Sequence, residues 1–260
     1  MAASGLAVAL LIIYLTLSPP TIYVASKHGL KHGALIGWFF LFAFCTLRIV
    51  SSAIELHDAH STSAALVASI GLSPLLAAAC GVLHESRAYL IPKFRRCLDT
   101  PFMIFFHLLV TTAIALVAAG AAKLNNTSLP PDQLKRSQNL VKVGMVMLLL
   151  GWISLALATL ATAICAVQHT SSHMSSKLSE SGGAKKLLLA VAFSIPFLGI
   201  RVMERLVYFF TNNQDLNPVT GSLGLRVGLE VIEELLVTSA LLIAGIVTRN
   251  IKTTPLPDQY

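Results

Sequence analysis

The feature that most constrains this chain is a series of seven long apolar runs separated by short polar segments. A membrane-spanning helix uses about 20 residues, so each run is long enough to cross a bilayer. The runs therefore predict an all-α, polytopic membrane protein with seven transmembrane helices in one bundle. The predicted spans are residues 3–25, 34–56, 63–84, 101–122, 141–167, 187–211 and 225–248.

The apolar runs leave little room for anything besides membrane helices. The chain has 260 residues, and the parts between the spans are short loops and tails. We therefore predict a single transmembrane domain over residues 1–260, without a separate soluble module. The first run lacks a basic segment before it and a small-residue cleavage site after it, so we expect a retained helix rather than a cleaved signal peptide.

The Lys and Arg residues indicate the orientation, because basic residues in short loops are retained on the cytosolic side. With the N-terminus outside, 11 of them fall in cytosolic loops and the C-terminal tail, and four fall in outer loops. This distribution predicts an outer or lumenal N-terminus and a cytosolic C-terminus. The outer loop between the fourth and fifth spans carries sequons at Asn125 and Asn126, which would make the protein a glycoprotein if they are used.

The formal net charge of +7 has two explanations, a nucleic-acid partner or membrane topology with contact to anionic lipids. The basic residues are dispersed over several loops and do not form one patch with interleaved aromatic residues, which favours the second explanation. We expect membrane lipid, and not nucleic acid, as a partner.

Charged residues inside the spans are rare, costly and commonly functional. Spans two, six and seven contain nine of them: Arg48, Glu55, Arg201, Glu204, Arg205, Arg226, Glu230, Glu233 and Glu234. Counted along their helices at about 1.5 Å per residue, all nine lie in the outer half of the bilayer.

The spacing of these residues predicts one charged face on each of the three helices; Arg226, Glu230 and Glu233, for example, are four and three residues apart. A charged face exposed to lipid would be prohibitive, so we predict that the three faces meet and line a polar cavity below the outer surface. Five acids against four bases leave one acid in surplus. A low dielectric favours the protonated form of that acid, which could then serve as a general acid.

A simpler alternative is that these charges are packing ion pairs at helix ends, without chemistry, and that Glu55, Arg205 and Arg226 are interfacial residues. Three acids within five residues of span seven exceed what pairing requires. This excess favours a chemical role.

Several classes of membrane protein are excluded by missing residues. Span seven has no Lys for a retinal Schiff base, and His107 is the one histidine well inside a predicted span, so paired haem ligands are absent. We find no His, Asp or Glu spacing typical of a zinc or di-iron site, and no Asp-rich motif for a magnesium-bound diphosphate. We therefore expect no metal site and no cofactor.

Aromatic residues crowd spans two, four and six, and most of them are expected to face lipid or the interface. Those near the acids could stabilise a carbocation by cation–π contact and present an apolar wall to a prenyl chain. The sequence alone does not say which aromatic residues these are. Our candidate substrate-binding residues are the aromatic Trp38 and Tyr208, together with Arg226.

The N-terminal third resembles a family of fungal seven-helix membrane proteins. The residues that carry the resemblance are Tyr14, Pro19, Tyr23, Lys27-His28-Gly29, Gly37-Trp38, Arg48 and Gly71-Leu72-Ser73-Pro74. In size, helix count and membrane acids the chain is also similar to the integral-membrane terpene cyclases of fungal meroterpenoid pathways, of the ascofuranone, ascochlorin and macrophorin kind.

The second resemblance implies an enzyme of secondary metabolism in the endoplasmic reticulum or another endomembrane. Its substrate would be a hydrophobic, prenylated small molecule in which a farnesyl group is attached to a polyketide-derived aromatic ring. Cyclisation would begin with protonation of a terminal epoxide or alkene and would need no metal. An epoxide is the easier substrate for a lone Glu, because an alkene demands a stronger acid.

Depth and spacing, rather than the resemblance, suggest the roles of individual residues. Our hypothesis is that Glu233 or Glu230 donates the initiating proton. Arg48 and Arg201 would orient and ionise the neighbouring acids, and Glu55 or Glu204 would accept the terminating proton. These six are the candidate catalytic residues.

Two other classes compete with the cyclase. A transporter or lipid translocator could use the same charges as a substrate or proton site, although seven spans without an internal repeat offer no inverted halves for alternating access. A receptor-like membrane protein would leave the acid surplus unexplained.

Overall fold

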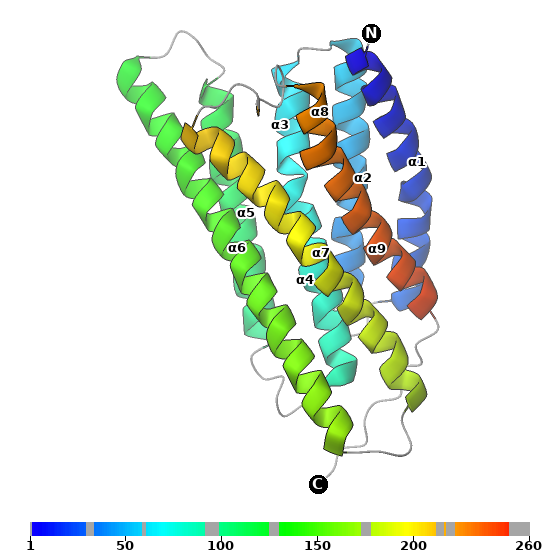
Figure 1. Cartoon of the computed structure of the whole chain (residues 1–260). Coiled ribbons are helices and arrows are strands. Elements are labelled where there is room, and N and C mark those ends of the chain that lie inside the picture. The colour runs from blue at the N-terminus through cyan, green and yellow to red at the C-terminus, as the bar shows by residue number, and fades with distance from the viewer. Residues whose placement is uncertain are drawn as a thin grey trace.

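The computed structural model describes residues 2–29, 34–58, 61–91, 99–124, 130–172, 178–211, 216 and 222–249, and this part of the chain is built from helices (Figure 1). The helices are α1 (Ala2–His28), α2 (Ala34–His57), α3 (Thr62–Ile70), α4 (Leu72–Leu90), α5 (Asp99–Leu124), α6 (Pro131–Ser172), α7 (Leu178–Thr211), α8 (Leu223–Arg226), the π-helical turn η4 (Val227–Val231) and α9 (Ile232–Thr248). The all-α prediction is confirmed. The sequons at Asn125 and Asn126 lie outside the described residues.

Seven helical segments are long and apolar enough to cross a membrane, as the sequence predicts. They are Gly5–His28, Leu35–His57, Leu66–Leu90, Asp99–Leu124, Pro131–Val167, Gly182–Thr211 and Leu223–Thr248. The first and third spans end later than predicted, so His28, Glu85 and Arg87 belong to helices and not to loops. These helices continue past their apolar runs because neighbouring helices supply partners for the polar side chains at their ends.

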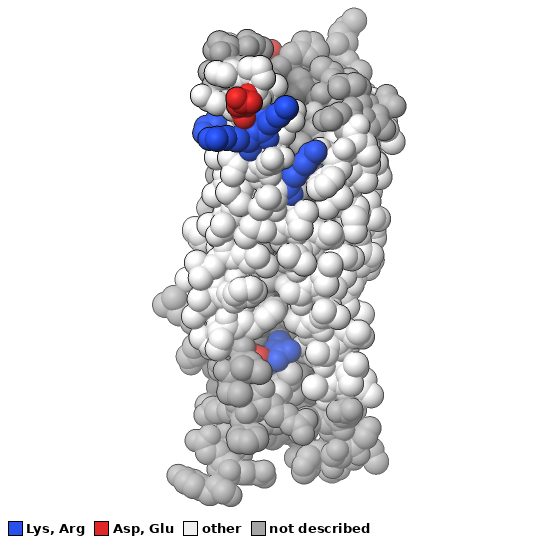
Figure 2. Space-filling view, turned by 90° about the vertical axis from the view of Figure 1, so that its left-hand side faces the viewer, with Lys and Arg blue, Asp and Glu red and all other residues white. Residues whose placement is uncertain are grey.

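The helices run roughly along one common direction, and α1 begins at the end of the bundle opposite to the end where α9 finishes (Figure 1). Many large apolar side chains point outward, among them Leu189, Val167 and Phe105, which are 70, 69 and 63% exposed. Figure 2 shows one face with charged side chains near its two ends and a broad uncharged band between them. This surface suits the hydrocarbon core of a bilayer, so the protein is a multi-pass membrane protein.

Helix α4 is the central helix of the bundle, because it contacts α2, α5, α6, α7 and α9, and most of its residues are buried. The third span is divided at Gly71, which lies between α3 and α4. Pro74 lies in the first turn of α4 and has no backbone N–H with which to continue the hydrogen bonding of α3.

Helices α2 and α4 touch through their backbones at Gly37 and Gly81. A Cβ atom on Gly81 would overlap the backbone of Gly37, and a Cβ atom on Gly37 would lie 2.9 Å from the carbonyl carbon of Gly81. Small residues permit such close approach between membrane helices. The contact brings Trp38 of α2 next to Glu85 of α4.

Candidate functional site

The three charged faces predicted from the sequence do meet, between α2, α7 and the start of the seventh span. Three arginines and three glutamates form one group, buried apart from the half-buried Glu204, which we call the central network. Its members are Arg48, Arg201, Arg205, Glu204, Glu230 and Glu234. The arginines are only 1–3% exposed, so Arg205 is not the interfacial residue that the simpler alternative supposed.

Glu230 is the hub of the central network. Its carboxylate lies 2.9 Å from Nη2 of Arg48, 2.8 Å from Nη2 of Arg201 and 3.1 Å from Nη2 of Arg205. Three cations around one carboxylate in a low dielectric hold that carboxylate in its ionised form. Glu230 therefore fixes α2, α7 and η4 relative to one another.

Two further acids complete the charge balance of the central network. Glu234 pairs with Arg48, and it accepts a hydrogen bond of 3.1 Å from Nε of Arg201. Glu204 pairs with Arg201 one helical turn away on α7, and it lies 3.8 Å from Nε of Arg205. Three carboxylates thus neutralise three guanidinium groups.

The charged side chains contact one another directly. At the level of the central network, the three charged faces that we predicted to line a polar cavity therefore meet as ion pairs.

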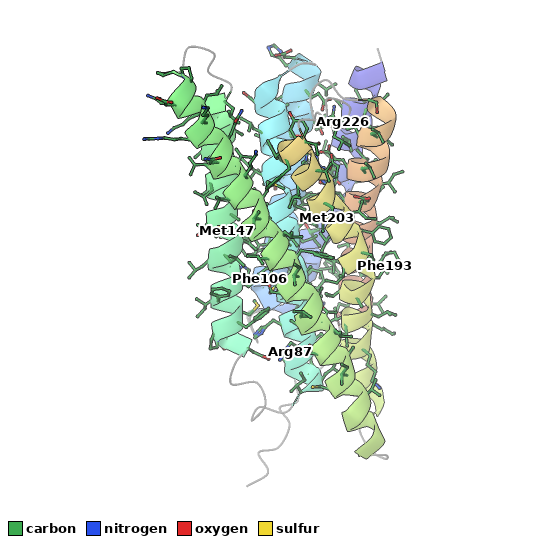
Figure 3. The ribbon with its side chains drawn as sticks, turned by 60° about the vertical axis from the view of Figure 1, so that its left-hand side comes forward. Arg87, Phe106, Met147, Phe193, Met203 and Arg226 are labelled. Atoms are coloured by element: carbon green, nitrogen blue, oxygen red, sulfur yellow. The ribbon has the colours of Figure 1, made fainter. Side chains whose placement is uncertain are left out.

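Arg226 and Glu55 form a separate pair nearer the end of the bundle. Nη1 and Nη2 of Arg226 donate to the two carboxylate oxygens of Glu55, and both distances are 2.7 Å. The Arg226 side chain is 18% exposed and lies at the end opposite to Arg87 (Figure 3). A two-pronged pair of this kind ties α8 to the end of α2.

The π-helical turn η4 contains the hub residue Glu230. Turns of this type are rare and frequently occur at functional sites. Here the turn joins Arg226, which reaches α2, to Glu230, which reaches both α2 and α7. No sequence pattern that we recognised predicts it.

Glu233 is the acid in surplus. Its residue is 5% exposed, it belongs to none of the ion pairs among the described residues, and its Oε2 atom has no hydrogen-bond partner there. The other four acids of the predicted set each pair with an arginine. The count of five acids against four bases thus predicted one acid without a basic partner, and in the described part of the structure that acid is Glu233.

Two aromatic residues missed by the sequence interpretation lie beside the central network. The Phe44 ring is 5.9 Å from the guanidinium carbon of Arg48, a cation–π distance, and Tyr14 packs edge-on against Phe44 at 5.5 Å. The Tyr14 side chain is buried, and its hydroxyl lacks a hydrogen-bond partner among the described residues. An aromatic residue in an apolar helix is usually interpreted as a lipid anchor. The one sequence signal for this contact was that Tyr14 and Arg48 belong to the same set of family-like residues.

Of the candidate substrate-binding residues, Tyr208 lies on the same helix as Arg205, half-buried, with its ring 4.9 Å from that of Phe209. Trp38 is not part of the central network. It precedes Arg48 by ten residues on α2, which is about 15 Å along the helix axis, and it is fully buried. Its indole donates to Glu85 instead and does not lie beside the acids, so its role in substrate binding stays a prediction.

That other end contains a second polar cluster, the His28 clamp, formed by His28, Trp38, Glu85 and Gly245. Nδ1 of His28 lies 2.5 Å from Oε1 of Glu85, and Nε1 of Trp38 donates to Oε2 of Glu85 at 3.0 Å. Nε2 of His28 lies 2.9 Å from the carbonyl oxygen of Gly245, which can only accept. One proton therefore sits between His28 and Glu85, and every polar atom of the two side chains has a partner.

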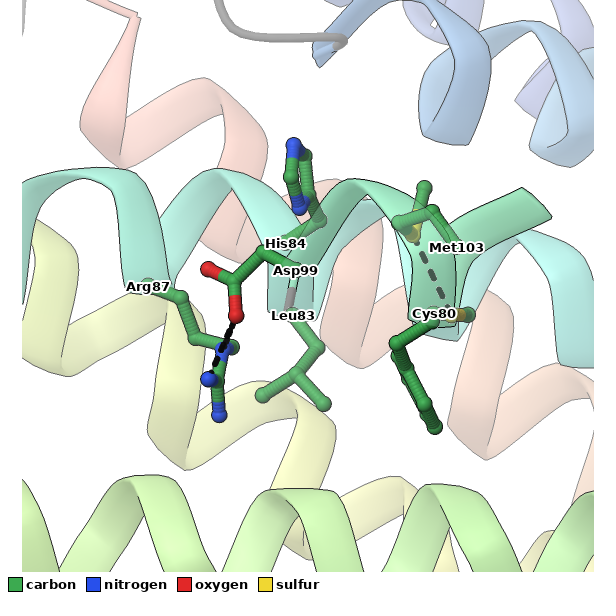
Figure 4. Close-up of a pocket in the computed structure, with 7 residues that line it drawn as sticks. Cys80, Leu83, His84, Arg87, Asp99 and Met103 are labelled. Carbon is green, nitrogen blue, oxygen red and sulfur yellow. Dashed lines mark hydrogen bonds and ion pairs between the residues drawn. The ribbon is translucent and has the colours of Figure 1, made fainter. Parts of the chain in front are cut away.

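A third polar group lies between α4, α5 and α6. Nε and Nη2 of Arg87 donate to Oδ1 of Asp99 at 3.0 and 2.6 Å, and Nη1 donates to Thr162 at 2.7 Å. Figure 4 shows the ion pair in a small pocket that also contains the Cys80–Met103 sulfur contact. Arg87 was assigned to a cytosolic loop from the sequence, and its place within α4 corrects that assignment.

Within the described part of the chain, no three His, Cys, Asp or Glu side chains come together in a way that could hold a metal ion. The acids of the central network have arginines as their partners instead.

Fold and site together define a seven-helix membrane protein with an ion-paired cluster inside the bundle. The chain belongs to the family described as "Domain of unknown function (DUF7702)", whose model matches residues 1–251. Comparison with curated proteins gave no match, and comparison with solved structures gave none either.

Proposed function

We propose that this protein is an integral-membrane terpene cyclase. Its substrate would be a farnesylated aromatic compound of fungal meroterpenoid metabolism, or the terminal epoxide of that compound. The proposal includes a location in the endoplasmic reticulum or another endomembrane, where a prenylated substrate would reach the protein through the lipid. The observation that carries it is the buried carboxyl of Glu233, which forms no ion pair with any described residue, beside a charge-balanced network.

The pairing pattern separates the two candidate acids. Glu230 faces three arginines and is ionised, so it cannot supply a proton. An unpaired carboxylate is expensive to bury, so the neutral, protonated form is favoured for Glu233. Glu233 is therefore the proposed general acid. Arg48 and Arg201 are positioning residues, because they hold Glu230 and Glu234 ionised and fixed.

Of the two candidate bases, Glu204 belongs to the central network beside the seventh span, whereas Glu55 pairs with Arg226 nearer the end of the bundle. Protonation of the epoxide oxygen by Glu233 breaks a C–O bond and leaves a hydroxyl group. The neighbouring alkenes then form the new C–C bonds, and Glu204 removes a proton from the final cation. One proton is gained and one lost, so the product is an isomer of the substrate, and transfer from Glu204 to Glu233 restores the site.

The test is turnover in microsomes that express the protein, with a farnesylated phenol and its terminal epoxide as substrates. We expect cyclic product from the epoxide and a loss of at least about 100-fold in Glu233→Gln, because general acids contribute roughly 10²–10⁴-fold. Asp132→Asn, an exposed carboxyl on α6, is the control for removal of an acid and should retain wild-type turnover.

Two results would contradict the proposal. Unchanged turnover in Glu233→Gln would remove Glu233 from its role as acid. Absence of cyclic product from both substrates, in protein shown to be folded, would favour a transporter that uses the same intramembrane charges.

A further inference from the structure

Arg205 is a buried cation whose hydrogen-bonding capacity is mostly unused. It is 3% exposed, and its Nη2 donates to Oε2 of Glu230 at 3.1 Å. Its Nε and Nη1 atoms have no hydrogen-bond partner among the described residues. A guanidinium group carries five N–H donors, one on Nε and two on each Nη. Three of the five therefore make no hydrogen bond among the described residues, although Nε lies 3.8 Å from a carboxylate oxygen of Glu204.

Unpaired donors in a protein interior are costly and uncommon, and each calls for an explanation such as a ligand. Arg48 beside it shows the same feature, since its Nε atom also lacks a hydrogen-bond partner among the described residues. The central network therefore offers more donors than its own carboxylates use.

The charge balance of the central network decides which acceptor suits these donors. Three arginines already face three carboxylates, and an added anion would bring a net negative charge into a low dielectric next to Glu204 and Glu230. A neutral oxygen satisfies the same N–H groups without that cost. A phosphate or a carboxylate is disfavoured for the same reason.

We infer that Arg205 binds a neutral oxygen acceptor, namely a hydroxyl, carbonyl or ether oxygen, of an amphiphile that enters from the lipid. Tyr208 follows Arg205 by three residues and so lies on the same side of α7. It is only half-buried, and Val207 beside it is 40% exposed, so this part of the helix extends from the central network to the lipid-facing surface. The inference deepens the proposed function, in which the polar ring of the substrate would bind Arg205.

The test measures binding and does not depend on turnover. Full-length protein in nanodiscs is unfolded thermally with three probes of equal chain length: 2-tridecanone as the neutral acceptor, tridecanoate as the anion and tridecane as the apolar control. We expect 2-tridecanone to raise the unfolding temperature saturably, by at least about twice the effect of either other probe.

Arg205→Lys preserves the positive charge opposite Glu230 but removes the planar fork of donors, so it should lose most of the 2-tridecanone effect. Arg136→Lys, an exposed residue on α6, is the matched control and should keep the effect. If Arg205→Lys does not fold, a diazirine-bearing ketone gives the answer on wild-type protein. It should crosslink to α7, and 2-tridecanone should compete with it while tridecane should not.

Equal responses to 2-tridecanone and tridecane would overturn the inference, and so would an unchanged ketone effect in folded Arg205→Lys. In either case bound water would be the partner of the Arg205 donors. Glu233→Gln separates this inference from the cyclase proposal, because it should abolish turnover and keep the ketone effect. A protein that makes no cyclic product but retains an Arg205-dependent ketone effect would refute the cyclase proposal alone.

Discussion

The His28 clamp and the central network, which lie toward opposite ends of the bundle, differ in how completely their buried polar groups are hydrogen-bonded. In the His28 clamp, both nitrogens of His28 and both oxygens of Glu85 have partners, and four helices are joined by a closed set of hydrogen bonds. In the central network the charges balance, yet donors on Arg48 and Arg205 have no hydrogen-bond partner in the described part of the chain, and neither has one oxygen of the nearby Glu233. A complete set of partners is typical of a structural role, whereas leftover groups beside rigid ion pairs are typical of a site that acts on something else.

Replacement of Glu by Gln tests this comparison, because the amide has nearly the shape of the carboxyl group but no charge. The largest expected effect is at the hub of the central network. Glu230→Gln would leave three arginines with two carboxylates, and breaking a buried ion pair costs about 3–5 kcal/mol. We expect a strongly lowered unfolding temperature in nanodiscs, or failure to accumulate folded protein. A wild-type unfolding temperature would show that the network does not hold the helices together.

The second effect concerns the helix crossing that positions the His28 clamp. Gly81→Ala places a Cβ atom where the backbone of Gly37 lies, so α2 and α4 must separate. Overpacking of this kind costs about 1–3 kcal/mol. Thermal unfolding measures the loss, and Gly5→Ala is the matched control because a Cβ atom there would meet nothing within 4 Å. Equal unfolding temperatures for the two variants would mean that the crossing tolerates a methyl group.

The sequence predicted the parts of the molecule that follow from periodicity and charge. Seven apolar runs gave the seven spans, and the positions of charged residues in spans two, six and seven showed that three helix faces meet. The charge count also predicted that one acid would lack a partner. These inferences succeed because burial of a charge in lipid is so costly that its position in the chain restricts its surroundings.

The His28 clamp was missed for a related reason. His28 and Glu85 lie just past their apolar runs. Hydrophobicity predicts the end of a membrane helix at that point and places the following polar residues in a loop. Their pairing unites α1 with α4, and the Gly37–Gly81 contact brings α2 against α4, so the clamp is made of residues from distant parts of the chain. The pairing of each glutamate with particular arginines depends on side-chain geometry in the same way, so the sequence could not choose between Glu230 and Glu233.

The third effect tests whether the His28 clamp is structural. Glu85→Gln can preserve every hydrogen bond, because its carbonyl oxygen accepts from Trp38 and its NH₂ group donates to Nδ1 of a neutral His28. We expect a loss below about 1 kcal/mol, whereas Glu85→Ala leaves two buried groups unpaired at about 1–3 kcal/mol each. The difference between their unfolding temperatures measures this. Equal and severe losses would indicate that the clamp needs the carboxylate charge, as the central network does.

The smallest expected effect on stability is at Glu233. Because this residue belongs to no ion pair among the described residues, Glu233→Gln should change the free energy of unfolding by less than about 0.5 kcal/mol. Measured beside Glu230→Gln in the same span, this variant distinguishes two explanations of the surplus acid. A residue kept for packing would lose stability when its carboxyl is replaced, and a residue kept for proton transfer would lose turnover alone. A loss of stability comparable to that of Glu230→Gln would place Glu233 within the structural network and remove the distinction drawn between the two ends of the bundle.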